Sequence, residues 1–338
     1  MPINRRKLLQ VTAFGVGAVS AKASYADELT ANPDPKLPRT EFGEESTAEE
    51  VTEGLDLTGH VALVTGCTSG IGYETMRVLA LRGVHVIGTG RTMEKAQKAC
   101  ESVDGMTTPV ALELSDFQTV VDCVASIRSL ELVPDIVVCN AGINTFGDLE
   151  LIGGIERIFR VNFLGHFVLV NQLLPMMKAN GGRIVHVGSR SGYLQAPAVG
   201  IDFDNLRGEG EFSSGEAYGR SKLANALFSF ALARRLEDSN ITSNVLHPGL
   251  VKTNIGRTAP ALIKGAFKLF GGLIAKTPEQ GAATQIFVAT SPTLAGVTGA
   301  YFEDCNPVIV DGPHHMYNEA MGEKLWATAE EMAEGFLV

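Results

Sequence analysis

Short apolar runs alternate with longer amphipathic stretches from His60 onward. The apolar runs predict buried strands, and the amphipathic stretches between them predict helices. Strands that are apolar along their whole length are typical of a parallel sheet with helices on both faces. The pattern therefore predicts an α/β fold built on a doubly wound parallel sheet, with ligands bound at the carboxyl ends of the strands. The expected strands are 60–65, 84–87, 109–114, 135–139, 183–187 and 241–246, and the expected helices are 71–82, one opening near 92, 117–130, 155–179, 216–236 and 319–334.

A glycine-rich run, Thr65-Gly-Cys-Thr-Ser-Gly-Ile-Gly72, follows the first expected strand and opens the first expected helix. In this context the glycines let the backbone approach a pyrophosphate, and the helix N-terminus offers unpaired N–H groups. A plain strand–helix turn is the alternative interpretation. We expect a Rossmann-type dinucleotide site that includes Gly66, Ser69, Gly70, Ile71 and Gly72.

The end of the second expected strand bears on which dinucleotide is bound. A carboxylate normally follows this strand when the ligand is the ribose 2′-hydroxyl of NAD. Here the strand ends in Gly90-Arg91, with no acid. Gly90 leaves room, and Arg91 offers a guanidinium suited to a 2′-phosphate. NADP(H) is therefore favoured over NAD(H), and the alternative for Arg91 is a solvated surface side chain.

The segment Tyr218-Gly-Arg-Ser-Lys222 places a phenol and an ammonium one turn apart on one face of an expected helix. Lowering the pKa of a free tyrosine from about 10 to about 7 takes roughly 4 kcal/mol. One poorly solvated cation, helped by the positive charge of an oxidised cofactor, can supply that stabilisation. The same spacing also arises on ordinary amphipathic helices. Tyr218 and Lys222 are therefore a candidate proton-transfer couple.

Residues from about 55 to 302 resemble the short-chain dehydrogenase/reductase family, in its compact single-domain branch. Besides the two motifs above, the resemblance rests on Asn140-Ala-Gly142 after the fourth expected strand and on Asn162 in the following helix. It also rests on Ile184-Val-His-Val-Gly-Ser189 in the fifth strand and on His247-Pro-Gly-Leu-Val-Lys-Thr253 after the sixth.

The resemblance implies an oxidoreductase that transfers a hydride between NADP(H) and a carbonyl or alcohol substrate. It gives Tyr218 the role of general acid or base, and Lys222 the roles of lowering the Tyr218 pKa and binding the nicotinamide ribose. Ser189 would orient the substrate oxygen, and Asn162 would hold a water. The implied cofactor contacts are Gly66, Ser69, Gly70, Ile71, Gly72, Arg91, Glu113, Asn140, Ala141, Gly142, Tyr218, Lys222, Pro248, Gly249 and Thr253.

Three positions depart from the family pattern or compete with it. Gly188 replaces the first serine of a common Ser-Ser pair. Ser191 is a rival to Ser189 and is interpreted as a loop hydroxyl. Glu113 stands where many members have an aspartate beside the adenine, and the longer acid can still accept that hydrogen bond.

A long interval separates Ser189 from Tyr218, and within it Asp202-Phe-Asp-Asn-Leu206 resembles the insert of retinol dehydrogenase-like proteins. The late stretch Gly299-Ala-Tyr-Phe-Glu-Asp-Cys305 carries the same resemblance. The apolar stretch 259–275 is interpreted as a small cap over a lipophilic substrate, with a plain surface helix as the alternative. Its apolar side chains include Leu262, Ile263, Phe267, Leu269 and Phe270. An alternative function is a catalytically silent cofactor-sensing or scaffolding protein, although such proteins usually lack the tyrosine or lysine.

The first 26 residues differ in kind from the rest. A charged start with Arg5-Arg6, a short apolar run over 11–21 and small residues before Ala26 resemble a bacterial twin-arginine export signal. The run is too short to span a bilayer, so no transmembrane span is expected. We expect export to the periplasm, with a cytoplasmic or organellar location as alternatives.

The remaining bounds come from charge and cysteine content. Residues 27–54 are acidic, contain three prolines and predict a linker before a single domain over 55–338. The net charge of −10 argues against a nucleic-acid or anionic-membrane partner. The five cysteines show no metal-ligand spacing, so neither a metal site nor a disulfide framework is expected. The partner is expected to be a small molecule, and the resemblance suggests a homo-oligomer.

Overall fold

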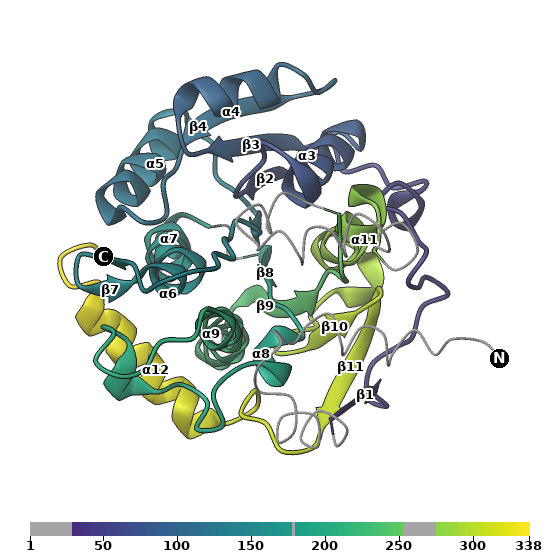
Figure 1. Ribbon diagram of the computed structural model, residues 1–338. Coiled ribbons are helices and arrows are strands. Elements are labelled where there is room, and N and C mark those ends of the chain that lie inside the picture. The colour runs from purple at the N-terminus through teal and green to yellow at the C-terminus, as the bar shows by residue number, and fades with distance from the viewer. Residues whose placement is uncertain (1–28, 178–179, 253–274) are drawn as a thin grey trace.

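The computed structural model describes residues 29–177, 180–252 and 275–338. This part of the chain is built around one large sheet with helices on both faces (Figure 1). In spatial order the strands are β1 (Thr30–Pro33), β11 (Asn306–Asp311), β10 (Tyr301–Glu303), β9 (Asn240–His247), β8 (Asn180–Val187), β5 (Ile136–Cys139), β2 (Val61–Val64), β3 (His85–Gly90) and β4 (Thr107–Ala111).

The strands from β10 to β4 pair in parallel throughout. β11 and β1 extend one edge of the sheet with antiparallel pairing. The chain passes from β2 to β3 and β4 on one side and resumes with β5, β8 and β9 on the other. The order therefore reverses between β2 and β5, which is where a doubly wound sheet binds its ligand. The doubly wound parallel sheet predicted from the sequence is confirmed.

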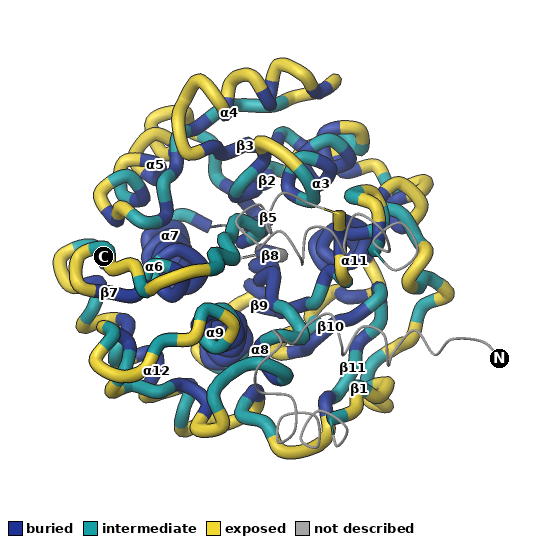
Figure 2. The backbone as a smooth tube through the Cα atoms, in the orientation of Figure 1, coloured by how far each residue is buried: buried dark blue, intermediate teal, exposed yellow. Residues whose placement is uncertain are grey.

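Helices form a layer on each face of this sheet. α3, α4 and α11 pack on one face, while α5, α7 and α9 pack on the other, with α12 outside α9 (Figure 1). Figure 2 shows α7 and α9 buried along their length, whereas α4 and α5 expose their outer sides. The described helices of eight residues or more are α3 (Gly70–Leu81), α4 (Met93–Cys100), α5 (Phe117–Ser129), α7 (Gly165–Leu173), α9 (Ser214–Arg235), α11 (Pro278–Thr290) and α12 (Glu319–Met332).

Shorter elements connect these layers. They are the 3₁₀ turns η1 (Glu50–Thr52), η3 (Leu174–Met176), η4 (Phe203–Asn205) and η6 (Pro292–Leu294), the π turn η2 (Arg160–Leu164), the short helices α6 (Arg157–Phe159) and α8 (Ser191–Leu194), and the hairpin strands β6 (Leu151–Ile152) and β7 (Ile155–Glu156). Most expected strand and helix ends agree with the observed ones to within a few residues.

The expected helix over 155–179 begins later and is less regular than the sequence pattern suggests. Gly153 and Gly154 adopt positive φ angles of 58° and 74° and turn the chain between β6 and β7. Glu156 then accepts hydrogen bonds from the N–H groups of Ile158 and Phe159, which fixes the helix start just after it. The next turn contains one residue more than a regular α-helical turn and forms the π segment η2. Such segments recur at functional sites.

The acidic segment interpreted as a linker lies against the domain over its described residues, 29–54. β1 pairs with β11, and η1 packs against α11. Ala48 and Val51 are buried, and the Ala48 N–H donates to the Glu279 carbonyl oxygen at 2.9 Å. These small apolar side chains interrupt the acidic run and give it a face to bury, which composition alone does not reveal. The helix they contact, α11, is also absent from the sequence prediction.

Two further observations concern membranes and thiols. Within the described residues, the model contains no helix that combines the length and the apolar character needed to cross a bilayer.

All five cysteines are buried and unbridged. Burial raises the pKa of the Cys123 and Cys139 thiols to about 12, so these side chains behave as small apolar groups.

Candidate active site

Hydrogen bonds from Asn140 and Ala141 to Thr65 fasten the carboxyl ends of β2 and β5 together. The Thr65 hydroxyl oxygen accepts from the N–H groups of Asn140 and Ala141, both at 2.9 Å. The Asn140 side-chain amide donates back to the Thr65 carbonyl oxygen at 2.8 Å. The sequence motifs after these two strands, expected to bind the cofactor, thus form one rigid unit at the switch point of the sheet.

The glycine-rich run has no room for side chains at its key positions. A Cβ at Gly72 would lie 2.3 Å from the Asn140 amide nitrogen and 2.4 Å from the Gly66 carbonyl oxygen. Ser69, the N-cap of α3, has an extended backbone and makes no side-chain capping bond, and the first turn of α3 carries no acidic residue. The first N–H groups of α3 are therefore not occupied by a cap, as a site for a pyrophosphate requires. A dinucleotide fits this arrangement.

Arg91 is exposed directly after β3 and just before α4. The structure explains the glycine at position 90 by close packing, whereas the sequence analysis explained it by room for the cofactor. A Cβ there would come within 2.9 Å of the Ala96 nitrogen on α4 and the Thr68 methyl group. Gly90 therefore allows α4 and the glycine-rich run to pack against the end of β3.

Glu113 follows β4 and is partly buried. One of its carboxyl oxygens accepts from Ser115, both from the N–H at 3.1 Å and from the hydroxyl at 2.8 Å. It lies beyond the carboxyl end of β4, the edge strand next to β3.

Tyr218, Lys222 and Ser189 come together as the sequence motifs predict. A side-chain hydrogen bond joins Ser189 to Tyr218. The Ser191 N–H donates to the Ser189 hydroxyl oxygen at 3.1 Å, while Ser191 itself begins α8. The geometry therefore favours Ser189 over Ser191 as the hydroxyl beside the tyrosine. The Lys222 ammonium lies 5.8 Å from the centre of the Tyr218 ring and donates to the Val187 carbonyl oxygen at 2.8 Å.

The pKa values differ from the expectation that Lys222 lowers that of Tyr218. Burial raises the pKa of Tyr218 to about 12, and the hydrogen bond from Ser189 opposes this only in part. Burial also lowers the pKa of Lys222 to about 8. The low-dielectric surroundings disfavour both the phenolate and the ammonium. The protein's own groups therefore keep Tyr218 in its protonated form at neutral pH.

Asn162 lies in the π segment and is fully buried. Its side chain accepts from the Ile143 N–H at 2.8 Å and donates to the Ile143 carbonyl oxygen at 2.9 Å and the Ser221 hydroxyl at 3.0 Å. A Cβ at Gly142 would lie 3.3 Å from the Asn162 amide oxygen and 3.7 Å from the Lys222 ammonium, so these two groups border the same space.

Sequence reasoning assigned no role to His166, which joins the two halves of this site. One ring nitrogen lies 3.0 Å from the Thr65 hydroxyl, and the other lies 3.1 Å from the Asn162 carbonyl oxygen. Since a carbonyl can only accept, the nitrogen beside Asn162 carries the proton and the other nitrogen accepts from Thr65. Burial lowers the pKa of His166 to about 4, which agrees with this neutral form. Its spacing of one helical turn from Asn162 was the available signal.

The motif after β9 is described only in part. Pro248 is buried, and Gly249 adopts a φ of 93°, where a Cβ would come within 2.7 Å of the Lys276 side chain. Thr253 lies outside the described residues. The predicted cap over 259–275 also lies outside them, except for Ala275.

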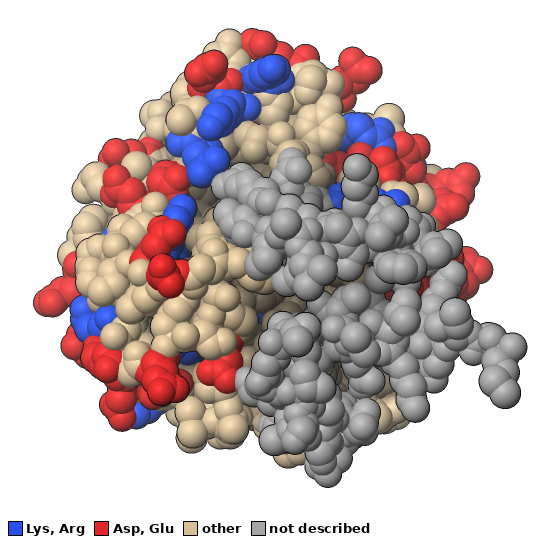
Figure 3. Space-filling view, viewed as in Figure 1, with Lys and Arg blue, Asp and Glu red and all other residues tan. Residues whose placement is uncertain are grey.

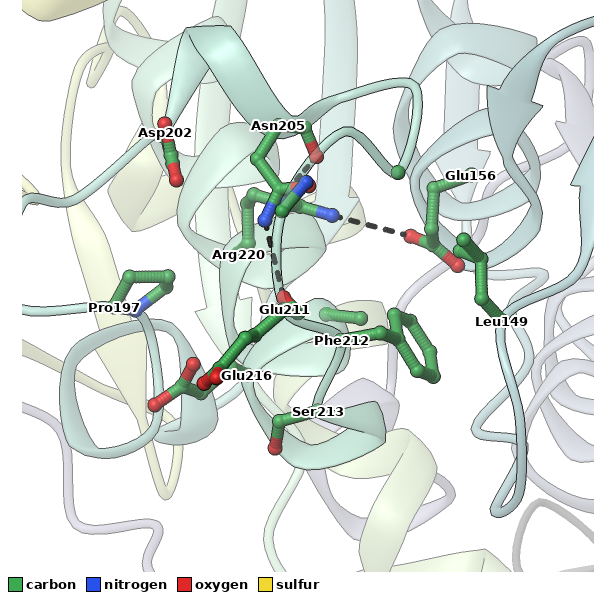
Figure 4. Close-up of a pocket in the computed structure, with 13 residues that line it drawn as sticks. Leu149, Glu156, Pro197, Asp202, Asn205, Glu211, Phe212, Ser213, Glu216 and Arg220 are labelled. Atoms are coloured by element: carbon green, nitrogen blue, oxygen red, sulfur yellow. Dashed lines mark hydrogen bonds and ion pairs between the residues drawn. The ribbon is translucent and has the colours of Figure 1, made fainter.

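The insert before Tyr218 lines a pocket of about 220 Å³ at the start of α9 (Figure 4). Arg220 lies at this pocket with only 5% of its surface exposed. Its guanidinium lies 3.7 Å from a Glu156 carboxyl oxygen and donates to the Asn205 carbonyl oxygen at 2.9 Å. These contacts attach the insert to α9 two residues beyond Tyr218. Sequence analysis did not single out Arg220 or Glu156, because an arginine inside the Tyr–Lys motif resembles a surface residue.

Comparisons with known proteins identify the family. Residues 60–201 match the family model for short chain dehydrogenases. The chain is 37% identical to short-chain dehydrogenase TIC 32 B, chloroplastic, of Brassica napus, over 86% of this chain and 94% of the relative. It is 36% identical to retinol dehydrogenase 14 of Homo sapiens, over 81% of this chain and 86% of the relative. A blue fluorescent protein from a metagenomic library, solved in complex with NADPH, matches with a TM-score of 0.59 at 25% identity, over 73% of this chain and 96% of that chain.

The protein belongs to the short-chain dehydrogenase/reductase family. Members of this family are oxidoreductases that use a nicotinamide cofactor and act on alcohol or carbonyl groups. Its relatives include retinol dehydrogenases, which confirms the resemblance drawn from the insert and the late Gly299–Cys305 stretch.

Proposed function

We propose that the protein transfers a hydride between NADP(H) and a lipophilic carbonyl or alcohol, with Asn162, Ser189, Tyr218 and Lys222 as catalytic residues. One observation carries this proposal. Ser189 hydrogen-bonds Tyr218 at the carboxyl end of β8, and the Lys222 ammonium lies one helical turn from that phenol. Lys222 is only 4% exposed, unlike the solvated lysine of an ordinary surface pair.

The chemistry follows from where each group lies. When bound, the nicotinamide supplies or accepts the hydride, and the protein orients the substrate beside it. Tyr218 is protonated at neutral pH and donates its proton to the developing alkoxide in carbonyl reduction. Ser189 donates a hydrogen bond to the same oxygen and so fixes its orientation. In alcohol oxidation the Tyr218 phenolate would accept the proton of the substrate hydroxyl.

Lys222 and Asn162 support this proton transfer. The Lys222 ammonium borders the space behind Tyr218, where it would bind the nicotinamide ribose. Since burial brings its pKa to about 8, it can exchange protons near neutral pH. Asn162 borders the same space and would hold the water that carries the proton toward solvent.

The preference for NADP(H) rests on charge at the end of β3. Arg91 is exposed there, and Lys95 and Lys98 of α4 are exposed nearby in sequence. Figure 3 shows Lys and Arg side chains over the region of α4. No acidic residue ends β3, so a free 2′-hydroxyl lacks its usual acceptor there, while Arg91 offers a guanidinium to a 2′-phosphate.

The lipophilic character of the substrate is supported by the apolar composition of 259–275 and by the retinol dehydrogenase relatives. The test is a screen of purified protein against aldehydes and ketones of increasing apolar length, with NADPH and NADH supplied separately. We expect substrate-dependent oxidation of NADPH that rises in kcat/KM with apolar length. Absence of turnover with every carbonyl and, in the reverse direction, every alcohol would contradict the proposed function.

We further propose that residues 1–26 direct export by the twin-arginine route, with the cofactor carried in a folded protein. This route fits a protein that binds NADP(H), because the cofactor is not regenerated outside the cytoplasm. Cell fractionation of the full chain and of its Arg5→Lys, Arg6→Lys variant tests the proposal. Export should be lost in the variant, and an unchanged distribution would refute it.

A further inference from the structure

The Glu303 carboxylate is buried at the end of β10 and receives four hydrogen bonds. Arg190 donates to its Oε2 twice, from Nε at 2.9 Å and from Nη2 at 2.5 Å. The hydroxyls of Tyr193 and Tyr301 donate to its Oε1 at 2.9 Å and 2.8 Å. Only 4% of Glu303 is exposed. The carboxylate is thus fully satisfied, and its Tyr193 and Tyr301 donors are buried with it, while the Arg190 side chain is 39% exposed.

Two of these donors belong to the segment that carries Ser189. Arg190 is the next residue, and Tyr193 lies on the short helix α8 that follows. The Arg190 N–H donates to the His247 ring at 3.4 Å, so Arg190 is held at both its backbone and its side chain. The Ser191 N–H donates to the Ser189 hydroxyl oxygen. The residues that follow Ser189 are therefore anchored to β9 and β10 by partners outside the proposed catalytic group.

We propose that Glu303 is a positioning residue for Ser189, acting through Arg190 and Tyr193. This inference rests on the proposed function, in which Ser189 orients the substrate oxygen. A buried carboxylate at one fixed point binds both Arg190, the N-cap of α8, and Tyr193 within that helix. It thereby holds the Ser189 hydroxyl where the Ser191 N–H and Tyr218 both reach it. It also gives a role to Glu303 in the late Gly299–Cys305 stretch, which otherwise marks only a resemblance.

Glu303→Gln is the informative change, because glutamine keeps the size and replaces one accepting oxygen by a donor. An amide nitrogen facing the Arg190 guanidinium or the two tyrosine hydroxyls cannot accept their hydrogen bonds. Loss of such a charge-assisted contact corresponds to about tenfold in an equilibrium or rate. We expect kcat to fall about tenfold while the affinity for NADPH stays unchanged, since the glycine-rich run does not contact Glu303.

A double-mutant cycle separates positioning from general structural support. If Glu303 acts through Ser189, then Glu303→Gln should have no further effect on kcat in a Ser189→Ala background. An equal loss of kcat in both backgrounds would overturn the proposal. The matched control is Glu74→Gln, because Glu74 is also buried and also accepts two N–H bonds from one arginine, Arg77. It should lower the melting temperature but leave kcat unchanged.

Amide hydrogen exchange tests the same inference without turnover. In Glu303→Gln the amides of residues 190–194 should exchange at least about tenfold faster than in the wild type, and Glu74→Gln should leave them unchanged. Unchanged exchange at 190–194 overturns the positioning role even if the enzyme is active. Faster exchange in a protein that turns over no carbonyl overturns the proposed function alone.

If Glu303→Gln does not fold, Tyr193→Phe is tested in its place. This change removes one hydrogen-bond donor to Glu303 and leaves the carboxylate paired with Arg190. The same cycle with Ser189→Ala then applies, with an expected fall in kcat of about threefold to tenfold in the Ser189 background only. An equal effect in both backgrounds would again overturn the proposal.

Discussion

A hydrogen bond between Lys222 and Val187 connects α9 to β8, the strand that precedes Ser189. The Lys222 ammonium donates to the Val187 carbonyl oxygen at 2.8 Å, and Val187 is the last residue of β8, two positions before Ser189. The same ammonium lies beside the Tyr218 ring. One buried ammonium therefore binds the end of β8 and lies close to the phenol.

Replacing Lys222 should affect activity more than stability. In Lys222→Met the ammonium is lost, and the alkyl part of the side chain is kept. We expect kcat/KM to fall at least about a hundredfold, because both ribose binding and proton exchange require the charge. Steady-state kinetics and thermal unfolding measure the two effects. Retention of more than about a tenth of wild-type kcat/KM would show that the ammonium is not part of the reaction.

Replacing Ser189 and replacing Ser191 should have clearly different effects on kcat. Ser189→Ala removes the hydrogen bond to Tyr218 and to the substrate oxygen, so kcat should fall by about a hundredfold or more. Ser191→Ala keeps the backbone N–H that bonds Ser189 and should change kcat by less than about threefold. Steady-state kinetics measured in parallel on the two variants would show which serine takes part in catalysis. A larger loss for Ser191→Ala would reverse the assignment.

Arg91→Ala should weaken NADPH binding at least about tenfold more than NADH binding, since only NADPH presents a 2′-phosphate to the guanidinium. Titration of each nucleotide by calorimetry gives the two dissociation constants. Arg128→Ala, an exposed arginine on α5, serves as the control for a general loss of charge. Equal weakening of both nucleotides by Arg91→Ala would refute the phosphate role.

Acid should destabilise the protein through His166. Its pKa is lowered to about 4 in the folded protein by burial, against an ordinary value of 6.5. Below pH 6.5 the unfolded chain binds a proton that the folded protein does not, so stability is present above pH 6.5 and is lost as pH falls toward 4. The difference corresponds to about 3 kcal/mol over that window. The free energy of unfolding in urea is measured at pH 7 and pH 5 for the wild type and for His166→Gln. It should fall less between these pH values in the variant, and equal falls would contradict the role of His166.

The sequence predicts the fold well because the strands are apolar throughout and each is followed by a distinctive turn. Gly66, Gly72 and Asn140 come after strands, and a parallel sheet brings such positions to one edge. Tyr218 and Lys222 were predictable from spacing once that edge was known. The observed Ser189 partner could then be expected.

Contacts between distant segments are what the sequence does not reveal. Glu303 at the end of β10 reaches Arg190 across β9, and His166 bridges Thr65 and Asn162. Arg190 and Glu303, like Thr65 and His166, lie about a hundred residues or more apart in sequence. The packing of residues 29–54 was missed for a similar reason, because two small apolar side chains within an acidic run suffice to bury one face. The pKa of Tyr218 depends on total burial, which a one-turn spacing does not encode.

Single-turnover hydride transfer in Tyr218→Phe tests the central claim most directly. Enzyme pre-bound to NADPH is mixed with a carbonyl substrate, and nicotinamide absorbance follows the transfer. If Tyr218 is the proton donor, the variant should bind NADPH as the wild type does, while hydride transfer slows by about 10²-fold to 10⁴-fold. Transfer at the wild-type rate in Tyr218→Phe would contradict the assignment of Tyr218 as the catalytic acid.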